Sequence, residues 1–532
     1  MKGKRSHGVD DIDSFSIKLA GPLIEDALLH LINLSIRKHT FAKSWKPQLI
    51  FPLHKKGDKL DVENYRPVSH LVEIGKMVEY AVYVQAVEHF TENLLFHENL
   101  HGSLSGHSTA TALIQVIDMW LEASEKTQLS ATLLLDQSAA YDLVDHQILL
   151  QKLRVYNFDE SAISWFQSYL SKRTQIVQVE SKQSMSSSNL EEHAVPQGSI
   201  LGGLIFIIFS NDFPDCNEVG QSVMYVDDDT DVVSDPDPEL LLQKIQFQAD
   251  RSASWLKDNR MCVSGDKSKL LISGTKKLRS SKLTRPMGIQ VDGKLVMETR
   301  SEKLLGLIIN NEMTWREHLY GETWREGDKN SPGLIPQLSQ RVGILRRISK
   351  YMSKNRLKLF SHGIFYSKLN YCLPVFGTVF GLDRYRDIST RYMSFTREDI
   401  RKLQVLQNSV MRLLSGAAWG TPTTTLLQLT DTLSVQQLVA SQTLIMVYKV
   451  IKTSKPTYIA QRLNLRNMDK HGEGSKISVP AHKLSTTKGG FILRGIQLYN
   501  RLPDQVKNEK NLKKFREAVK TWVIRNISAR PN

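Results

Sequence analysis

Three aspartates follow two strand-like segments that lie far apart in the chain. Asp136 comes directly after the apolar run 131–135, and Asp227 and Asp228 come after a second strand-like run at 222–226. Carboxylates that converge repel one another unless a cation lies between them. Hard oxygen ligands suit Mg²⁺, and two such ions about 3.5–4 Å apart stabilise both the attacking and the leaving oxygen of an in-line phosphoryl displacement. The pattern therefore predicts a two-metal site for phosphoryl transfer.

The alternative for any one Asp-Asp pair at a turn is a solvated pair of acids with no ligand. It weakens here because the acids follow apolar strands and the break Pro196-Gln197-Gly198 lies between the two acidic segments. The elements that must position the acids are also ordered. Strand-like runs at 131–135, 222–226, 230–233 and 269–273 alternate with helical segments at 146–170, 199–210 and 238–257. This order predicts one sheet with helices on one side, an α+β fold.

Further elements are expected on both sides of this core. We expect helices at 14–43, 71–95 and 108–125, strands at 175–180 and 192–195, a hairpin at 289–296 and a final amphipathic helix at 511–527. Asp292-Gly293 supplies the hairpin with residues that tolerate positive φ. The last 220 residues are predicted to be mostly helical.

The composition points to a polyanionic partner. The chain has 532 residues, with 70 Lys and Arg against 55 Asp and Glu, which gives a formal net charge of +15. Such a charge suits nucleic acid first and an acidic membrane surface second. The longest apolar run, 201–209, is shorter than the ~20 residues of a spanning helix, so no membrane protein is expected. No secretory signal is visible, and three separated cysteines fit a reducing, intracellular compartment.

Seven short motifs occur in a fixed order along the chain. They are NYRPVS at 64–69, GHST at 106–109, LDQSAAYDLVDH at 135–146, VPQGSILG at 195–202, YVDD at 225–228, DKS at 266–268 and LLG at 304–306. Each is weak alone, but the ordered set resembles the reverse transcriptases of non-LTR retrotransposons of the jockey-like type. The resemblance covers nearly the whole chain.

This resemblance implies a right-hand polymerase fold. It has fingers, a ferredoxin-like antiparallel palm sheet, a helical thumb and a mostly helical C-terminal extension. The implied boundaries are 1–130 for the fingers, 131–310 for the palm, 311–420 for the thumb and connection, and 421–532 for the extension, with a reverse transcriptase domain at about 45–310.

The resemblance also implies roles for the motif residues. Asp136, Asp227 and Asp228 would hold two Mg²⁺ ions, with Mn²⁺ as an alternative and the carbonyl of Gln137 as an added ligand. Lys267 would act as a general acid toward pyrophosphate. The alternative, to which we give equal weight, is an exposed lysine in a loop. The residues implied in binding the incoming nucleotide are Arg66, Lys55, Lys56, Tyr141, Gln197 and Gly198. Tyr141 would be a steric gate against the ribose 2′-OH, or else a core aromatic. Lys55 and Lys56 have a solvated loop as their alternative.

A basic stretch beyond the palm resembles a thumb helix that grips a duplex backbone. It contains no acid, which disfavours the alternative of a merely solvated helix face. Its implied contacts to phosphates are Arg341, Arg346, Arg347, Lys350, Lys354, Arg356 and Lys358.

The implied activity is that of an RNA-directed DNA polymerase, with an RNA template, a DNA primer and dNTPs as partners and no membrane. Endonuclease activity is expected from a separate or missing domain, and a nuclear location is implied by the family alone. Two other readings are a catalytically decayed, basic RNA-binding remnant of a mobile element and a group II intron-like maturase.

Overall fold

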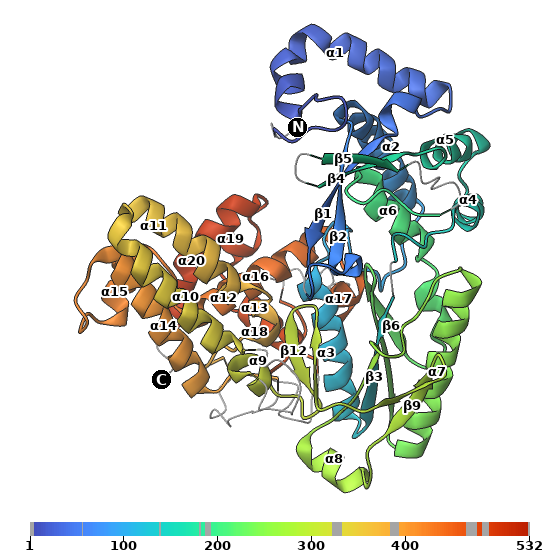
Figure 1. Ribbon diagram of the computed structural model, residues 1–532. Coiled ribbons are helices and arrows are strands. Elements are labelled where there is room, and N and C mark those ends of the chain that lie inside the picture. The colour runs from blue at the N-terminus through green and yellow to red at the C-terminus, as the bar shows by residue number, and fades with distance from the viewer. Residues whose placement is uncertain are drawn as a thin grey trace. The chain divides into compact units, whose positions relative to one another are not determined.

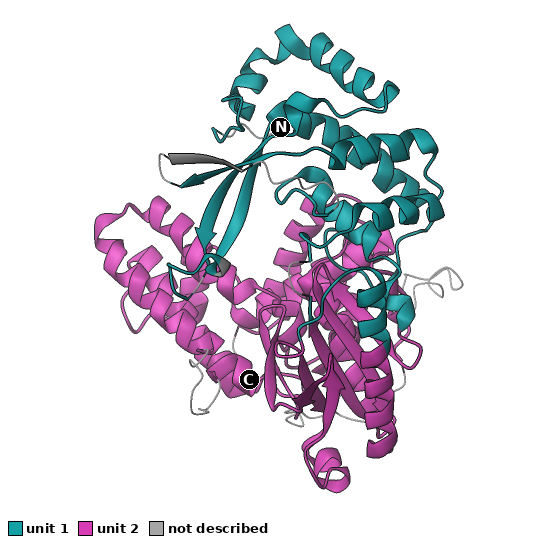
Figure 2. Ribbon diagram, turned by 45° about the vertical axis from the view of Figure 1, so that its right-hand side comes forward, with its two compact units in different colours: residues 1–103, 136–216, 251–264 teal, residues 104–135, 217–250, 265–532 magenta. Residues whose placement is uncertain are grey.

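The chain divides into two compact units that are each discontinuous in sequence (Figure 2). The first comprises 1–103, 136–216 and 251–264, and the second comprises 104–135, 217–250 and 265–532. The structure is a computed structural model, and it describes residues 5–55, 57–137, 140–179, 182–186, 193–321, 332–382, 393–463, 476–480 and 489–529.

The first unit contains a four-stranded sheet in the order β2-β1-β4-β5. β1 (Gln48–His54) pairs antiparallel with β2 (Tyr65–Leu71) and parallel with β4 (Gln175–Val179), which pairs antiparallel with β5 (Lys182–Ser186). The predicted strand at 192–195 is wrong. The partner of β4 is β5 (Lys182–Ser186), which lies between the two predicted strands.

Five helices of the first unit are α1 (Ser14–Arg37), α2 (Glu73–Glu92), α4 (His146–Val155), α5 (Glu160–Leu170) and α6 (Ile200–Phe209) (Figure 1). The single helix predicted at 146–170 is wrong, because Asn157 adopts φ +60° and Asp159 begins a new helix. The Asp159 carboxylate accepts a hydrogen bond from the Ala162 amide at 2.7 Å, a typical N-cap. The helical core includes Trp165 stacked on Tyr169 with ring centroids 5.5 Å apart.

Helix α1 passes a test that the longest uninterrupted apolar run of the sequence, 201–209, does not pass. Among the described residues it is long and apolar enough to cross a membrane by length and composition. Few of its residues are buried, and Leu19 and Leu23 are almost fully exposed. Lys18, Glu25 and Asp26 interrupt the apolar run of this helix, so a search for uninterrupted apolar runs does not find it. Helices of soluble proteins pass the same test, so it does not by itself assign α1 to a bilayer.

The second unit is built on a sheet in the order β6-β7-β3-β8. These strands are β6 (Gln221–Tyr225), β7 (Asp228–Asp235), β3 (Leu129–Asp136) and β8 (Lys269–Ser273), with Asp136 itself counted in the first unit. β6 pairs antiparallel with β7, and β3 pairs antiparallel with β8. Ser130 near the start of β3 contacts Ser234 near the end of β7, Oγ to Oγ 2.9 Å, which indicates that β3 and β7 also run antiparallel.

Helices α3 (Thr109–Glu125) and α7 (Pro238–Asp258) pack on opposite faces of this sheet (Figure 1). Trp120 of α3 donates from Nε1 to Thr132 Oγ1 at 2.8 Å, whereas Gln248 of α7 reaches Asp231. The expectation of helices on one side only is therefore wrong for this sheet. Because successive side chains of a strand alternate between faces, both faces of β7 carry buried residues.

Two small hairpins follow the sheet. β9 (Gly288–Val291) and β10 (Lys294–Met297) are joined by Asp292-Gly293, whose φ values of +51° and +71° confirm the predicted turn. β11 (Ser301–Leu304) and β12 (Leu307–Asn310) are joined by Leu305-Gly306, again with positive φ at both residues.

The remainder of the second unit is mostly helical, as predicted. The first of these helices are α8 (Lys276–Lys282), α9 (Arg316–Tyr320), α10 (Leu334–Ile348), α11 (Lys354–Ser361), α12 (Ser367–Asn370) and α13 (Leu373–Phe376). They are followed by α14 (Arg397–Ser415), α15 (Thr423–Thr430), α16 (Val435–Thr453), α17 (Thr457–Arg462), α18 (Phe491–Asn500), α19 (Asp504–Lys507) and α20 (Leu512–Asn526).

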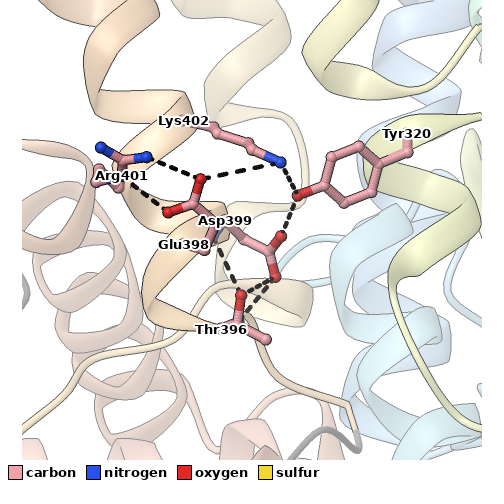
Figure 3. Close-up of polar contacts among 6 residues, drawn as sticks. All are labelled: Tyr320, Thr396, Glu398, Asp399, Arg401 and Lys402. Carbon is pink, nitrogen blue, oxygen red and sulfur yellow. Dashed lines mark hydrogen bonds and ion pairs between the residues drawn. The ribbon is translucent and has the colours of Figure 1, made fainter.

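The start of α14 is fixed by a polar cluster (Figure 3). Thr396 and Asp399 form a capping box, in which the Asp399 amide donates to Thr396 Oγ1 and Asp399 Oδ2 accepts from the Thr396 amide. The same carboxylate accepts a hydrogen bond from the hydroxyl of Tyr320 at the end of α9. Burial, together with Asp399, raises the pKa of Tyr320, so the phenol remains a donor that ties α14 to α9.

Candidate functional site

Asp136 is the last residue of β3, and its side chain is exposed. Its carbonyl accepts a hydrogen bond from the Ser264 amide at 3.3 Å, and the next residue, Gln137, forms an isolated bridge with Val263. The Gln137 side chain is buried, and neither its oxygen nor its nitrogen has a hydrogen-bond partner. The apolar strand thus ends by delivering one carboxylate to the surface, as a metal ligand requires.

Asp227 and Asp228 lie at the turn between β6 and β7. Val226 and Asp227 form the two-residue connection, Val226 adopts φ +61°, and Asp228 begins β7. Both aspartates are exposed, whereas Met224 and Asp229 next to the turn are buried. The strand-like runs predicted at 222–226 and 230–233 are confirmed as β6 and β7, and the acids lie at the turn that joins them.

The segment after Asp136 returns as a turn that carries Tyr141 and Asp142. The Tyr141 ring stacks on the buried Phe206 of α6, with centroids 5.0 Å apart. Asp142 is exposed and accepts a hydrogen bond from Gln197 Nε2 at 3.1 Å. Two of the residues predicted to bind nucleotide, Tyr141 and Gln197, are therefore each tied to a neighbouring element of the first unit.

Gly198 occupies a position that a side chain would disturb. Its φ is +91°, and a Cβ added there would lie 2.9 Å from the carbonyl oxygen of Ser69 on β2. The following helix, α6, begins at Ile200, whose amide donates to Glu79 Oε2 at 2.7 Å. Burial raises the pKa of Glu79. Two contacts hold the Gln197-Gly198 turn. Its backbone approaches β2 closely at Ser69, and the Ile200 amide that follows it donates to Glu79.

An ion pair between a buried carboxylate and an exposed guanidinium supports the same unit. Asp145 is 1% exposed, accepts from the Ile148 amide at 2.9 Å and pairs with Arg260 Nη1 at 2.6 Å. Burial alone would raise the pKa of Asp145, but the Ile148 amide and the Arg260 guanidinium together lower it. The carboxylate therefore stays ionised and caps α4 next to the Tyr141 turn.

The predicted phosphate contacts of the first unit lie at one hairpin. Arg66 is an exposed residue of β2, with Leu53 of β1 as its Cα partner. Lys55 is exposed just beyond the end of β1, and its amide donates to the Asn64 carbonyl at 2.8 Å. Lys56 lies outside the described residues. Arg66 and Lys55 thus present their cationic groups to solvent from adjacent strands.

Lys267 lies in the turn before β8 and is exposed. Its neighbour Asp266 forms an ion pair with Lys294 of β10. This contact links the turn to the β9–β10 hairpin.

The seven cations of the basic stretch do not share one helix. α10 ends at Ile348, and α11 begins at Lys354 after extended backbone at Met352 and Ser353. The continuous helix predicted over 341–358 is therefore wrong. Six of the cations are exposed, whereas Arg341 is half-buried and donates from Nη1 to the Ile364 carbonyl.

A cavity of about 400 Å³ lies beside α10 in the second unit. Lys303, Arg341 and Lys368 contribute three cations to its wall, and none of them pairs with a described carboxylate. Burial lowers the pKa of Lys368, and repulsion from Arg341 and Lys303 lowers it further. The buried His318 also lines the cavity, and burial lowers its pKa to about 3, so it is neutral. Such a wall suits an anion.

Several of these residues carry no signal of their role in the sequence. Glu79, Lys303 and Lys368 belong to no quoted motif, and isolated charged residues in helices and strands carry no signal of their position in a fold. Asp145 lies within the motif 135–146, and an Asp directly before a helical run is a recognisable N-cap signal.

Across the described ranges, no group of three His, Cys, Asp or Glu side chains is arranged to hold a metal ion. The donor chemistry nevertheless fits Mg²⁺, because Asp136, Asp227 and Asp228 are exposed carboxylates at strand ends and need not be desolvated at a cost.

Comparisons with known proteins identify relatives of this chain. Residues 53–309 match the family model described as reverse transcriptase (RNA-dependent DNA polymerase). The RNA-directed DNA polymerase from mobile element jockey of Drosophila funebris is 25% identical over 434 residues, which cover 79% of this chain and 43% of that protein. The probable RNA-directed DNA polymerase from transposon BS of Drosophila melanogaster is 25% identical over 432 residues, covering 80% and 44%. The chain thus spans under half the length of these relatives, and the matches confirm the resemblance inferred from the ordered motifs.

Among solved structures, telomerase from Candida tropicalis in complex with a TWJ fragment of telomeric RNA is 13% identical with a TM-score of 0.36, covering 82% of this chain and 67% of that chain. Telomerase from Candida albicans in complex with the same kind of fragment is 11% identical with a TM-score of 0.35, covering 82% and 70%.

Proposed function

We propose that this chain, which carries a reverse transcriptase domain at residues 53–309, is an RNA-directed DNA polymerase of a non-LTR mobile element. It extends a primer 3′-OH with dNTPs on an RNA template. The observation that carries this proposal is the order of the sheet, in which β3 ends at Asp136 and its neighbour β7 begins at Asp228. Both carboxylates are exposed, as ligands must be.

The proposed right-hand polymerase fold is based on the two four-stranded sheets. In this proposal the sheet β6-β7-β3-β8 is the core of the palm at 131–310, and the β1–β2 hairpin with α1, α2 and α3 belongs to the fingers at 1–130. Helices α10, α11 and α14 form the thumb, and the helices beyond residue 420 form the extension.

Asp136, Asp227 and Asp228 would hold two Mg²⁺ ions, or Mn²⁺ in their place, with the Gln137 carbonyl as an added ligand. Bound ions would offset charge on the triphosphate and lower the pKa of the primer hydroxyl. The protein's part is to present exposed carboxylates from strand ends, so that little reorganisation is needed when substrate arrives.

The first unit binds the incoming nucleotide. Arg66 can grip a phosphate through two parallel N–H donors, whereas Lys55 and Lys56 act as point charges. Gln197 and Gly198 form the floor beneath the base and sugar, where the absence of a Cβ lets the backbone approach closely. Tyr141 closes the space that a ribose 2′-OH would need, and its stack on Phe206 supports that position.

Lys267 is the proposed general acid toward departing pyrophosphate. Its exposed position in a turn before β8 supports access to a bound triphosphate. The proposal requires its ammonium to donate a proton to a phosphate oxygen.

The basic stretch and the adjacent cavity bind the template–primer backbone. The exposed cations Arg346, Arg347, Lys350, Lys354, Arg356 and Lys358 contact phosphates without reading sequence. Arg341 also lines the cavity, together with Lys303 and Lys368. The positive charges of these three side chains support the binding of one backbone phosphate there. A nuclear site of action is also proposed, on the relationship to mobile elements alone.

Primer extension tests the function. Wild-type protein with Mg²⁺, dNTPs and a primed RNA template is expected to extend the primer, and Asp227→Asn is expected to bind the same duplex without extending it. Equal extension by both proteins would contradict the proposed metal site. Salt-sensitive RNA binding with no incorporation by the wild type would instead identify the chain as a decayed binding remnant.

A further inference from the structure

Two aspartates of β7 are buried on the face of the sheet that α7 covers. Asp229 is 2% exposed and Asp231 is fully buried. They are two residues apart on one strand, so their side chains lie on the same face, opposite to that of Asp228. Their cross-strand partners on β6 are Met224 and Ser222.

The Asp231 carboxylate is surrounded by hydrogen-bond donors. Its Oδ1 accepts from the Ser222 hydroxyl, from Asn217 Nδ2 at 3.4 Å and from Gln248 Nε2 at 3.3 Å. Donors that converge on a carboxylate favour its ionised form. Three donors therefore converge on one oxygen of Asp231, two residues from Asp229.

The Asp229 carboxylate has no comparable support. Both of its oxygens are buried without a hydrogen-bond partner, and so is Oδ1 of Asn217. An unpaired ionised carboxylate in a protein interior is strongly unfavourable unless its charge is neutralised. A second acid beside the ionised Asp231 increases that cost.

A proton would remove the charge of Asp229 but not its unsatisfied polar atoms. The single O–H group of the neutral acid can donate to one amide oxygen only, and the remaining oxygens would still lack a donor. One cation satisfies all of these oxygens at once. Among the described residues, the buried oxygens without a hydrogen bond in this cluster are both carboxylate oxygens of Asp229, Asn217 Oδ1 and Gln248 Oε1, and hard divalent cations prefer oxygen ligands of this kind.

We propose that Asp229, Asp231 and Asn217 bind one hard divalent cation, with Mg²⁺ as the expected ion. Side chains two residues apart on a strand begin about 7 Å apart, and carboxylates that lean together can share an ion with metal–oxygen distances of about 2.0–2.6 Å. The ion joins β7 to the segment before β6, and so braces the hairpin whose tip carries Asp227 and Asp228. The site does not depend on the proposed polymerase activity.

Metal titration of a variant that lacks the tip carboxylates tests this site. The full chain with Asp227→Asn and Asp228→Asn is stripped with a chelator and titrated with Mn²⁺, and free Mn²⁺ is followed by electron paramagnetic resonance. One bound equivalent is expected in this parent, and none after the further change Asp229→Asn. The matched control is Asp292→Asn, which removes an exposed acid at the β9–β10 turn and is expected to keep the bound equivalent.

Thermal unfolding provides a second readout. Mn²⁺ is expected to raise the melting temperature of the parent and to leave that of Asp229→Asn unchanged. With chelator present, Asp229→Asn is expected to be at least as stable as the parent, because a buried charge has been removed. Where Asp229→Asn does not fold, Asn217→Ala serves in its place. No Mn²⁺ bound by the parent at millimolar concentration, or an equivalent retained without Asp229, would overturn the proposal.

Discussion

The ring of Tyr141 stacks on the ring of Phe206, with centroids 5.0 Å apart and planes inclined by 18°. Phe206 is buried in α6, and α6 follows directly after the Gln197-Gly198 turn. The stack therefore links the motif at 135–146, which contains Tyr141, to the helix that follows the motif at 195–202. It leaves the Tyr141 side chain little freedom to swing away, and a steric gate needs this rigidity.

Replacing Tyr141 with Ala is expected to weaken discrimination against ribonucleotides. Removal of the ring opens the space for a 2′-OH, and a shape contact of this size corresponds to about 10-fold or more in relative kcat/KM. Single-nucleotide insertion with dNTP and rNTP measures the ratio. Tyr141→Phe keeps the stack and should retain wild-type discrimination. Unchanged discrimination in Tyr141→Ala would remove Tyr141 from the nucleotide site.

Replacing Gly198 with Ala is expected to destabilise the first unit. The substitution forces an L side chain into φ +91° and sets a Cβ 2.9 Å from the Ser69 oxygen. Strain of this kind costs about 1–3 kcal/mol, which chemical denaturation measures. Gly21→Ala in α1 is the control, because a Cβ there meets nothing within 4 Å. A variant as stable as wild type would show that the turn adapts.

Removing the charges of Arg346, Arg347 and Lys350 is expected to flatten the salt dependence of duplex binding. For each phosphate that the protein no longer neutralises, the slope of log K against log salt falls in magnitude by about 0.7–0.9. Fluorescence anisotropy over a salt series measures this slope. The exposed Lys257, Lys276 and Lys277 provide a control of equal charge, whose removal should alter the slope less. Equal slopes in both triple variants would contradict a specific grip by α10.

Asp145→Asn is expected to destabilise the protein at neutral pH by about 1–3 kcal/mol, because it breaks a buried charged hydrogen bond. The pKa of Asp145 is lowered in the folded state. Its contribution is therefore complete above the unfolded value of about 4 and is lost as pH falls through the lower folded value.

Denaturation at several pH values checks this prediction. The difference between wild type and Asp145→Asn should shrink as Asp145 becomes protonated in acid. Glu160→Gln breaks the exposed ion pair with Arg154, and should change stability little at any pH. If the difference in stability between wild type and Asp145→Asn did not change with pH, the charge of Asp145 would contribute nothing to stability.

Local patterns were sufficient to predict many elements. The acidic hairpin of β6 and β7, the Asp292-Gly293 turn and the final helix depend on residues within a few positions of one another, and all three are present. Errors occurred where the local pattern was continuous but a cap interrupted it. Asp159 divides 146–170, and the extended backbone at Met352 and Ser353 divides the basic stretch.

The sequence by itself determined the kind of chemistry, because residue types and their order along the chain are enough to define the motifs around Asp136, Gln197 and Asp227. Only the tertiary structure decided which charged groups are neutralised. Asp145 pairs with Arg260, Asp231 accepts from Ser222, Asn217 and Gln248, and the Asp229 carboxylate accepts from no donor in the described part of the chain. The reason is physical: the energy of a charge depends on its burial and on neighbours that lie as many as 115 residues away in sequence, and no local pattern records either.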